Sequence, residues 1–171
     1  MSEVLPNLKS IFARSANEVF GTHKGVMPWS GQKADIDFLK QTVYDKNVII
    51  GRTTYKTAPK SLFNNVNRVY VLTSQDKVIN TKQTVKIESI EAIIKEIKHK
   101  HNETFVCLGG FEVFKKLLPR SCYVYETCFN FNVSEDQAIY LSMGAIDNSV
   151  KETINLHLKG LDGVIKLHYL E

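Results

Sequence analysis

Short apolar runs alternate with amphipathic segments along this chain, and that alternation is the feature that most constrains its fold. Residues 47–51 read as a buried strand, and residues 89–100 read as a helix with isoleucines on one face. By the same criteria we predict further strands at 8–14, 68–73, 84–87, 104–108 and 121–131, and further helices at 33–44, 52–57 and 110–118. Strands that alternate with helices form a largely parallel sheet covered by helices on both faces.

The C-terminal part departs from this alternation. Residues 152–159 and 164–170 flank the turn sequence Leu161-Asp162-Gly163, so we predict a hairpin that adds antiparallel strands to the sheet. The segments 16–32 and 58–68 are predicted loops. A chain of 171 residues without a repeat or a linker indicates a single α/β domain over residues 1–171.

Composition argues against several classes of protein. Apolar residues make up 43% and charged residues 23% of the chain, as in ordinary soluble globular proteins. The apolar runs are too short to span a bilayer, and residues 1–7 lack the apolar core of a signal peptide. The three cysteines lack metal-ligand spacing, so we expect buried, reduced thiols and a cytoplasmic protein. The five histidines form no ligand motif, and we expect no metal.

The net charge of +4 is mild, although basic residues gather at 95–101. This cluster is either a nucleic-acid patch or the solvated C-terminal end of a helix. No aromatic platform accompanies it, which favours the second interpretation. We therefore expect no binding to nucleic acid. We also expect a monomer that does not bind membranes.

One carboxylate lies on an otherwise apolar helical face. The face comprises Asp35, Phe38, Leu39, Thr42 and Val43, spaced i, i+3, i+4, i+7 and i+8. An ionised carboxylate facing an apolar interior is costly unless it is paired. Asp35 either accepts two parallel N–H donors of a ligand, or lies in the first helical turn because the helix dipole favours acids there.

Two strand-to-helix turns have the character of phosphate sites. Gly51-Arg52-Thr53-Thr54 brings backbone N–H groups, hydroxyls and a guanidinium to a helix N-terminus, and Gly109-Gly110 opens the next such helix. Both turns could hold a pyrophosphate, because free N–H groups and the helix dipole favour anions. The alternative is that the glycines only permit tight turns. The standard G-x-G-x-x-G fingerprint is absent.

Six blocks of sequence complete the pattern. Met27-Pro28-Trp29 is followed, six residues after the tryptophan, by Asp35. The other blocks are Ile11-Phe12-Ala13 with Val19-Phe20-Gly21, then Val48 to Tyr55, Val69 to Ser74, Val106 to Gly110, and Tyr125-Glu126-Thr127. Taken in their order along the chain and with their spacing, over about residues 8–140, the blocks resemble the dihydrofolate reductase family.

The resemblance implies a three-layer α/β fold and an oxidoreductase that uses NADPH. The implied reaction is hydride transfer to 7,8-dihydrofolate, giving 5,6,7,8-tetrahydrofolate for one-carbon metabolism and thymidylate synthesis. Antifolate inhibitors are the implied further ligands. Residues 21–30 would act as a lid over the site. A cis peptide between Gly109 and Gly110 is also implied.

The site residues follow from the same resemblance. The implied catalytic residues are Asp35, Trp29, Met27 and Thr127. The implied substrate-binding residues are Ile11, Phe12, Ala13, Asp35, Leu39, Arg68 and Thr127. The implied cofactor-binding residues are Ala13, Gly21, Gly51, Arg52, Thr53, Thr54, Thr73, Ser74, Leu108, Gly109, Gly110 and Phe114.

The chain departs from its family at three positions. Leu39 replaces the usual phenylalanine four residues after the acid, and Glu112 replaces a basic residue after the glycine pair. Asn67 stands where the family has the arginine for the folate tail; our hypothesis is that Arg68 is re-aimed to that site, with Lys40 or Lys60 assisting. Two alternatives remain: a reductase of another pterin-like or pyrimidine heterocycle, and a non-catalytic binding module.

Overall fold

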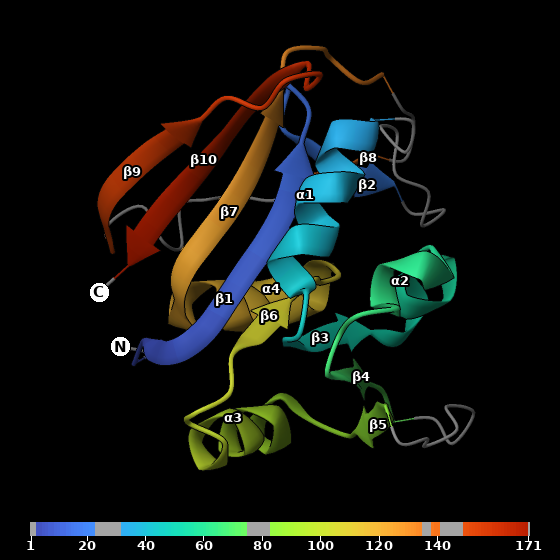
Figure 1. The fold of residues 1–171 in the computed structure, drawn as a ribbon, viewed down its shortest axis with the longest axis vertical. Helices are drawn as coiled ribbons and strands as arrows, with labels where there is room; N and C mark the ends of the chain where they lie inside the picture. Colours follow the sequence, from blue (N-terminus) through green and yellow to red (C-terminus); the bar gives the residue numbers. More distant parts are fainter. Residues whose placement is uncertain (1–2, 23–31, 75–82, 135–137, 141–148, 171) are drawn as a thin grey trace.

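The computed structural model describes residues 3–22, 32–74, 83–134, 138–140 and 149–170 (Figure 1). At its centre lies an eight-stranded sheet with the order β5-β4-β3-β6-β1-β7-β10-β9. Its strands are β1 (Leu5–Arg14), β3 (Asn47–Gly51), β4 (Arg68–Leu72), β5 (Thr84–Ile87), β6 (Phe105–Cys107), β7 (Ser121–Phe129), β9 (Val150–Leu156) and β10 (Gly163–Leu170).

The pairing confirms the predicted mixed sheet. Strands β5, β4, β3, β6, β1 and β7 are joined by parallel pairs, whereas β10 is antiparallel to both β7 and β9. The predicted C-terminal hairpin is therefore present as β9 and β10. Because the parallel strands share one direction, their carboxyl ends meet at one edge, where ligands of such sheets bind.

Helices cover both faces of the sheet, as predicted. The helices are α1 (Lys33–Val43), α2 (Arg52–Thr57), α3 (Ile90–His99) and α4 (Phe111–Leu117), with short 3-10 turns η1 (Lys60–Phe63) and η2 (Leu118–Arg120). Neighbouring residues on β4 point to opposite cores: Val69 packs in the cluster that contains Val43 of α1, and Tyr70 in the cluster that contains Ile93 of α3. Figure 1 shows α1 crossing in front of β1, with α4 behind the sheet.

The structure differs from the sequence-based assignment in two strands. The predicted loop 16–32 contains β2 (Val19–Thr22), which pairs antiparallel with β8 (Ala138–Tyr140) in a second small sheet. Strands this short carry little periodicity, and their stability comes from a partner distant in the chain. In addition, β1 begins at Leu5 instead of residue 8, and η1 lies within the predicted loop 58–68.

A buried row of polar side chains crosses the sheet on the α3 and α4 side. Glu126 of β7 is 3% exposed. Its Oε2 accepts from Arg14 Nε at 2.7 Å, and its Oε1 lies 3.0 Å from His168 Nε2. His168 Nδ1 in turn lies 2.9 Å from Thr153 Oγ1 of the edge strand β9. Four strands are thereby tied together through one carboxylate.

The three cysteines are free thiols. Cys107 and Cys122 are buried, and Cys128 is half-buried. Burial raises the pKa of Cys107 to about 12 and that of Cys128 to about 11. Both thiols are therefore held in the protonated, unreactive form.

Candidate active site

Asp35 is joined to the sheet by a hydrogen bond to Thr127. Asp35 lies in the first turn of α1, and its Oδ1 accepts from Thr127 Oγ1 of β7 at 2.9 Å. Thr127 is 1% exposed, whereas Asp35 is half-buried. Among the described residues, no cation forms an ion pair with Asp35. The carboxylate thus faces the sheet, as the ligand interpretation requires, and the α1 N-cap has no side-chain hydrogen bond.

Burial raises the pKa of Asp35, and the Thr127 hydroxyl opposes this rise by donating to the charged form. A carboxyl with a raised pKa exchanges a proton nearer to neutral pH than an exposed aspartate does. Such a group can hold the N–H edge of a heterocycle when it is charged and can influence protonation of the bound ring.

Apolar surface beside Asp35 is only partly covered by the protein. Val43 is the one fully buried residue of α1, whereas Ile36, Phe38 and Leu39 remain half-buried. Phe38 meets Tyr125 of β7 edge-on, with ring centroids 5.7 Å apart. This incomplete coverage leaves an aromatic and aliphatic surface next to the carboxylate.

Two residues at this surface were missed by sequence reasoning. Ile36 directly follows Asp35, and Tyr125 lies two residues before Thr127. The alternation of side chains along β7 places Tyr125 on the same face as Thr127 and therefore could have identified it.

The end of β1 contributes to both faces of the sheet. Ile11 packs in the same apolar cluster as Leu39 and Leu108, on the α1 side. Phe12 packs on the opposite side, with Phe20 and Phe114. Phe12, predicted together with Ile11 to bind the substrate, thus directs its side chain to the opposite face, because successive strand residues point to opposite faces. Ala13 follows at the strand end and is half-buried.

The two glycine turns are in direct contact. The Gly51 N–H donates to the Gly109 carbonyl at 2.6 Å. A Cβ on Gly110 would lie 2.8 Å from Thr54 Oγ1, so the Thr54 side chain packs against the Gly110 backbone as closely as glycine allows. The peptide between Gly109 and Gly110 is cis, as the resemblance implies. Because the Gly51 N–H is already paired, the remaining donors at this turn belong to the α2 residues that follow.

Arg52 brings a buried guanidinium nitrogen to these turns. Its Nε is buried and has no hydrogen-bond partner among the residues that the structure describes. A buried, unpaired guanidinium nitrogen is costly unless an acceptor binds it. Neither α2 nor α4 has a side-chain N-cap. Thr53 is exposed and Thr54 is half-buried beside Arg52. This donor set fits a phosphate group.

The other predicted cofactor-binding residues differ in their exposure and in the elements that carry them. Thr73 and Ser74 follow β4, with Thr73 half-buried and Ser74 exposed. Gly21 lies in β2 opposite Ile139. Phe114 is only 1% exposed, so its ring is covered by protein instead of facing outward. Met27 and Trp29 lie outside the described residues.

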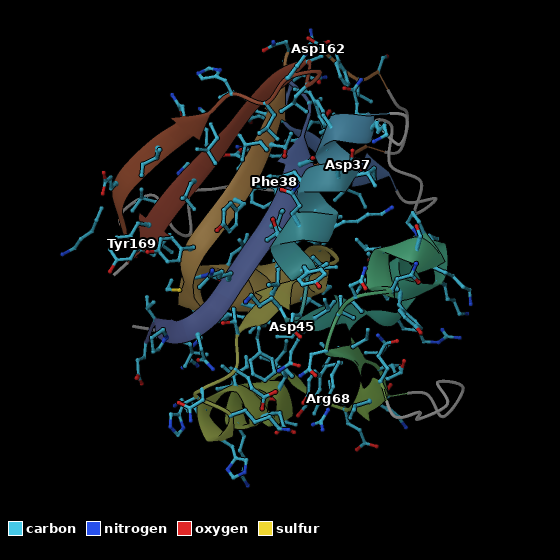
Figure 2. The ribbon with its side chains drawn as sticks, in the orientation of Figure 1. Asp37, Phe38, Asp45, Arg68, Asp162 and Tyr169 are labelled. Carbon is cyan, nitrogen blue, oxygen red and sulfur yellow. The ribbon has the colours of Figure 1, made fainter. Side chains whose placement is uncertain are left out.

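Arg68 does not point toward Asp35. The register between β3 and β4 runs without a bulge from Asn47 opposite Arg68 to Gly51 opposite Leu72. The hydroxyl of Tyr70, with smaller contributions from Glu103 and Glu96, raises the pKa of Arg68, which places the guanidinium on the α3 side. Figure 2 shows Arg68 near α3 and far from Phe38. The hypothesis that Arg68 is re-aimed toward the folate tail is therefore wrong, because ordinary alternation along the strand sets the direction of its side chain.

Gly109 offers a test of how tightly the glycine turns are packed. A Cβ on Gly109 would lie 2.4 Å from Phe114 Cε2, and its φ is +94°. We expect Gly109→Ala to lower the free energy of unfolding by about 2–5 kcal/mol, from backbone strain and overpacking together. Gly160→Ala is the matched control, since Gly160 has φ +85° but no atom within 4 Å. Urea unfolding of both variants measures the difference; equal losses would contradict the packing argument.

Two further observations concern the described residues as a whole. They contain no group of three or more histidines, cysteines, aspartates or glutamates placed to hold a metal ion. They also contain no helix of the length and apolarity that crossing a membrane requires.

These elements define an α/β protein with two glycine turns in contact at the carboxyl edge of a mostly parallel sheet. A sequence model of dihydrofolate reductase matches residues 7–147. The chain belongs to the dihydrofolate reductase family. It is 27% identical to a dihydrofolate reductase of Enterococcus faecium over 148 residues, which cover 86% of this chain and 84% of that one. It is 30% identical to one of Mycoplasma pneumoniae over 119 residues, covering 66% and 70%.

A solved structure shares the whole fold. Dihydrofolate reductase from Enterococcus faecalis, complexed with NADP(H) and RAB-propyl, superposes with a TM-score of 0.76. The match covers 98% of each chain at 20% sequence identity. The predicted fold class is thereby confirmed over nearly the full length.

Proposed function

We propose that this protein reduces 7,8-dihydrofolate to 5,6,7,8-tetrahydrofolate with NADPH. The observation that carries the proposal is the hydrogen bond from Thr127 to Asp35, set beside half-buried Ile36, Phe38 and Leu39. A pteridine ring presents an amino group and a ring N–H side by side, and one carboxylate accepts both. The flat ring would lie on the apolar surface next to it. The similar proteins named above are dihydrofolate reductases.

NADPH supplies the hydride when it is bound. The buried Nε of Arg52 and the uncapped start of α2 provide donors for its phosphates. The glycine pair after β6 lets the backbone approach a ligand closely. The similar structure from E. faecalis was complexed with NADP(H), which supports this choice of cofactor.

The residues of the chain bind the pteridine ring, orient the Asp35 carboxylate and promote protonation of the ring. Asp35 holds the pteridine edge, and its raised pKa favours protonation of the bound ring. Thr127 orients the carboxylate by donating to Oδ1. Ile11, Leu39 and Leu108 form the apolar surroundings that keep this interaction strong.

The remaining roles are assigned by family resemblance. Trp29 and Met27 would close over the ring, and Gly21 would lie at the base of that lid. Ala13 would lie near the nicotinamide, and Thr73 with Ser74 near the adenosine. The proposal also includes a single domain, a monomer in the cytoplasm, and inhibition by antifolates.

The direct experiment is to follow loss of the NADPH absorbance band with dihydrofolate present. We expect turnover that methotrexate abolishes, because the drug carries the same paired N–H edge. Loss of the NADPH band with another pterin-like or pyrimidine heterocycle, but not with dihydrofolate, would favour that heterocycle as substrate. Lack of any turnover would favour the non-catalytic alternative.

The cofactor assignment predicts a specific role for Arg52. A charge-assisted hydrogen bond to the 2′-phosphate should be lost in Arg52→Ala. We expect the Michaelis constant for NADPH to rise about tenfold or more, with a much smaller rise for NADH, which lacks that phosphate. Lys56→Ala, an exposed basic residue of the same helix, is the matched control. Equal effects on both cofactors would assign Arg52 to the pyrophosphate or to the fold.

A further inference from the structure

The Thr127 hydroxyl lies where two strand ladders end. The parallel pairing of β1 with β7 ends one residue pair beyond Ala13 and Thr127. On the other side of β7, the antiparallel pairing with β10 begins near the same point, and Ile165 opposite Thr127 is its third pair. The ends of ladders open more readily than their centres. Because Thr127 is β-branched and stiff at χ1, a movement of its backbone also moves the hydroxyl that donates to Asp35.

The buried row on the reverse face joins both ladders at this level. Glu126, which directly precedes Thr127, accepts from Arg14 Nε of β1 at 2.7 Å and lies 3.0 Å from His168 Nε2 of β10. Nη2 of Arg14 contacts the same carboxylate. Charge-assisted hydrogen bonds of this kind are short and strong. One carboxylate therefore holds the strands on either side of β7 against it (Figure 1).

The protonation state of the row follows from its partners. His168 and Arg14 lower the pKa of Glu126 against the effect of burial, so Glu126 is ionised at neutral pH and can only accept. His168 Nε2 therefore carries a hydrogen atom and donates it. Lys166 lies directly opposite Glu126 in β10. The Cys128 thiol, whose pKa burial raises to about 11, also interacts with Glu126 and stays protonated.

The carboxyl group of Asp35 reports where the Thr127 hydroxyl lies. Burial raises the pKa of Asp35, and the hydrogen bond from Thr127 lowers it. Separation of the two oxygens from 2.9 Å to beyond about 3.5 Å would remove this bond and raise the pKa further. Loss of the Glu126 charge, acting directly, would instead lower the pKa of Asp35. The sign of the change therefore distinguishes an effect of position from an effect of charge.

We propose that Glu126, held by Arg14 and His168, is a positioning residue that keeps the Thr127 hydroxyl on Asp35. It lies on the opposite face of the sheet from Asp35 and acts through the backbone of β7. The inference rests on the proposed function, because it gives the buried row a part in the dihydrofolate site. The row thus has a role in activity that is separate from its role in stability.

The test is the titration of Asp35 in the ligand-free protein, followed by NMR of isotope-labelled aspartate carboxyls. Thr127→Val removes the hydroxyl, keeps the shape, and should raise the pKa of Asp35 by the full effect of the hydrogen bond. Glu126→Gln keeps the size of the side chain and should give most of the same rise. The double variant should match Thr127→Val alone, because both changes act on one hydrogen bond. Glu152→Gln, on the exposed strand β9, is the control and should leave the pKa unchanged.

Three results with folded Glu126→Gln would overturn the proposal. An unchanged pKa of Asp35 would limit the row to stability, and a lowered pKa would show a direct effect of charge. Additive changes in the double variant would show a route other than Thr127. If Glu126→Gln does not fold, His168 decides: His168→Gln keeps a donor for Glu126 and should preserve the pKa of Asp35, whereas His168→Ala should raise it. Equal pKa values in these two variants would overturn the proposal.

Turnover separates this inference from the proposed function. The NMR titration needs no substrate, so the expected pKa changes in a protein that does not reduce dihydrofolate would support the positioning role and contradict the reductase. In an active enzyme, kcat should fall as the pH rises through the pKa of Asp35. This fall should move to higher pH in Glu126→Gln. A fall that stays at the same pH would overturn the positioning role and leave the reductase in place.

Discussion

Asp35→Asn is expected to lower the turnover of dihydrofolate by more than about 10²-fold at neutral pH. Asparagine has the same shape and still accepts the hydrogen bond from Thr127. It carries no charge to pair with the pteridine edge and cannot exchange a proton with the bound ring. Steady-state NADPH oxidation at saturating dihydrofolate measures the effect.

The same substitution should leave the fold intact. Because burial raises the pKa of Asp35 in the folded state, its ionised form opposes folding at neutral pH. We therefore expect the free energy of unfolding of Asp35→Asn at pH 7 to equal or exceed that of the unmodified protein. The difference in the free energy of unfolding between the two proteins should shrink as the pH falls through the raised folded-state pKa of Asp35, because Asp35 then becomes neutral.

Asp37→Asn is the matched control for this experiment. Asp37 lies two residues further along α1 and forms a surface ion pair with Lys33, with 48% of its side chain exposed. We expect its activity to remain within about twofold of normal, since exposed ion pairs contribute little. Near-normal turnover of Asp35→Asn would remove Asp35 from the mechanism.

Glu126→Ala is expected to lower the free energy of unfolding by about 3–5 kcal/mol. Removal of this carboxylate leaves Arg14 and His168 in the sheet without their shared partner. Removing one partner of a buried ion pair costs far more than the net value of the pair. Urea unfolding at pH 7 gives the loss directly. Glu152→Ala, on the exposed edge strand β9, should change it by less than about 0.5 kcal/mol.

The pH dependence of this effect has a definite sign. Burial alone would raise the pKa of Glu126. The hydrogen bonds and charges of His168 and Arg14 outweigh burial and lower this pKa below its ordinary value of 4.5. Its stabilisation is present above the unfolded-state pKa and is lost as the pH falls through the folded-state pKa. The stability difference between the two proteins should therefore narrow only below about pH 4.5. A loss under 1 kcal/mol at pH 7 would show that the network relaxes around the gap.

The sequence Tyr125-Glu126-Thr127 shows how far sequence reasoning reaches. Alternation along a strand predicts that Thr127 and Tyr125 share one face and that Glu126 takes the other. The structure bears this out: Thr127 bonds Asp35, Tyr125 meets Phe38, and Glu126 enters the buried row. Periodicity cannot predict which residues each face contacts, because those residues come from distant segments of the chain.

Arg68 illustrates the opposite case. Because Arg68 is adjacent to Asn67, where the family has an arginine, the sequence suggested that Arg68 takes over that role. The unbroken register of β3 with β4 leaves no bulge that could turn the side chain. Register is a property of two paired strands, so one strand's sequence did not decide it.

Local patterns by themselves determined the alternating elements, the mixed sheet, and the helical face that carries Asp35. These follow from side-chain periodicity and turn chemistry, which act within a few residues. Only the tertiary structure decided the β2–β8 pair, the contact of Gly51 with Gly109, and the burial of the Arg52 Nε. Each depends on segments brought together by the whole sheet. Burial and hydrogen-bond partners across such distances are set by packing, which no local pattern encodes.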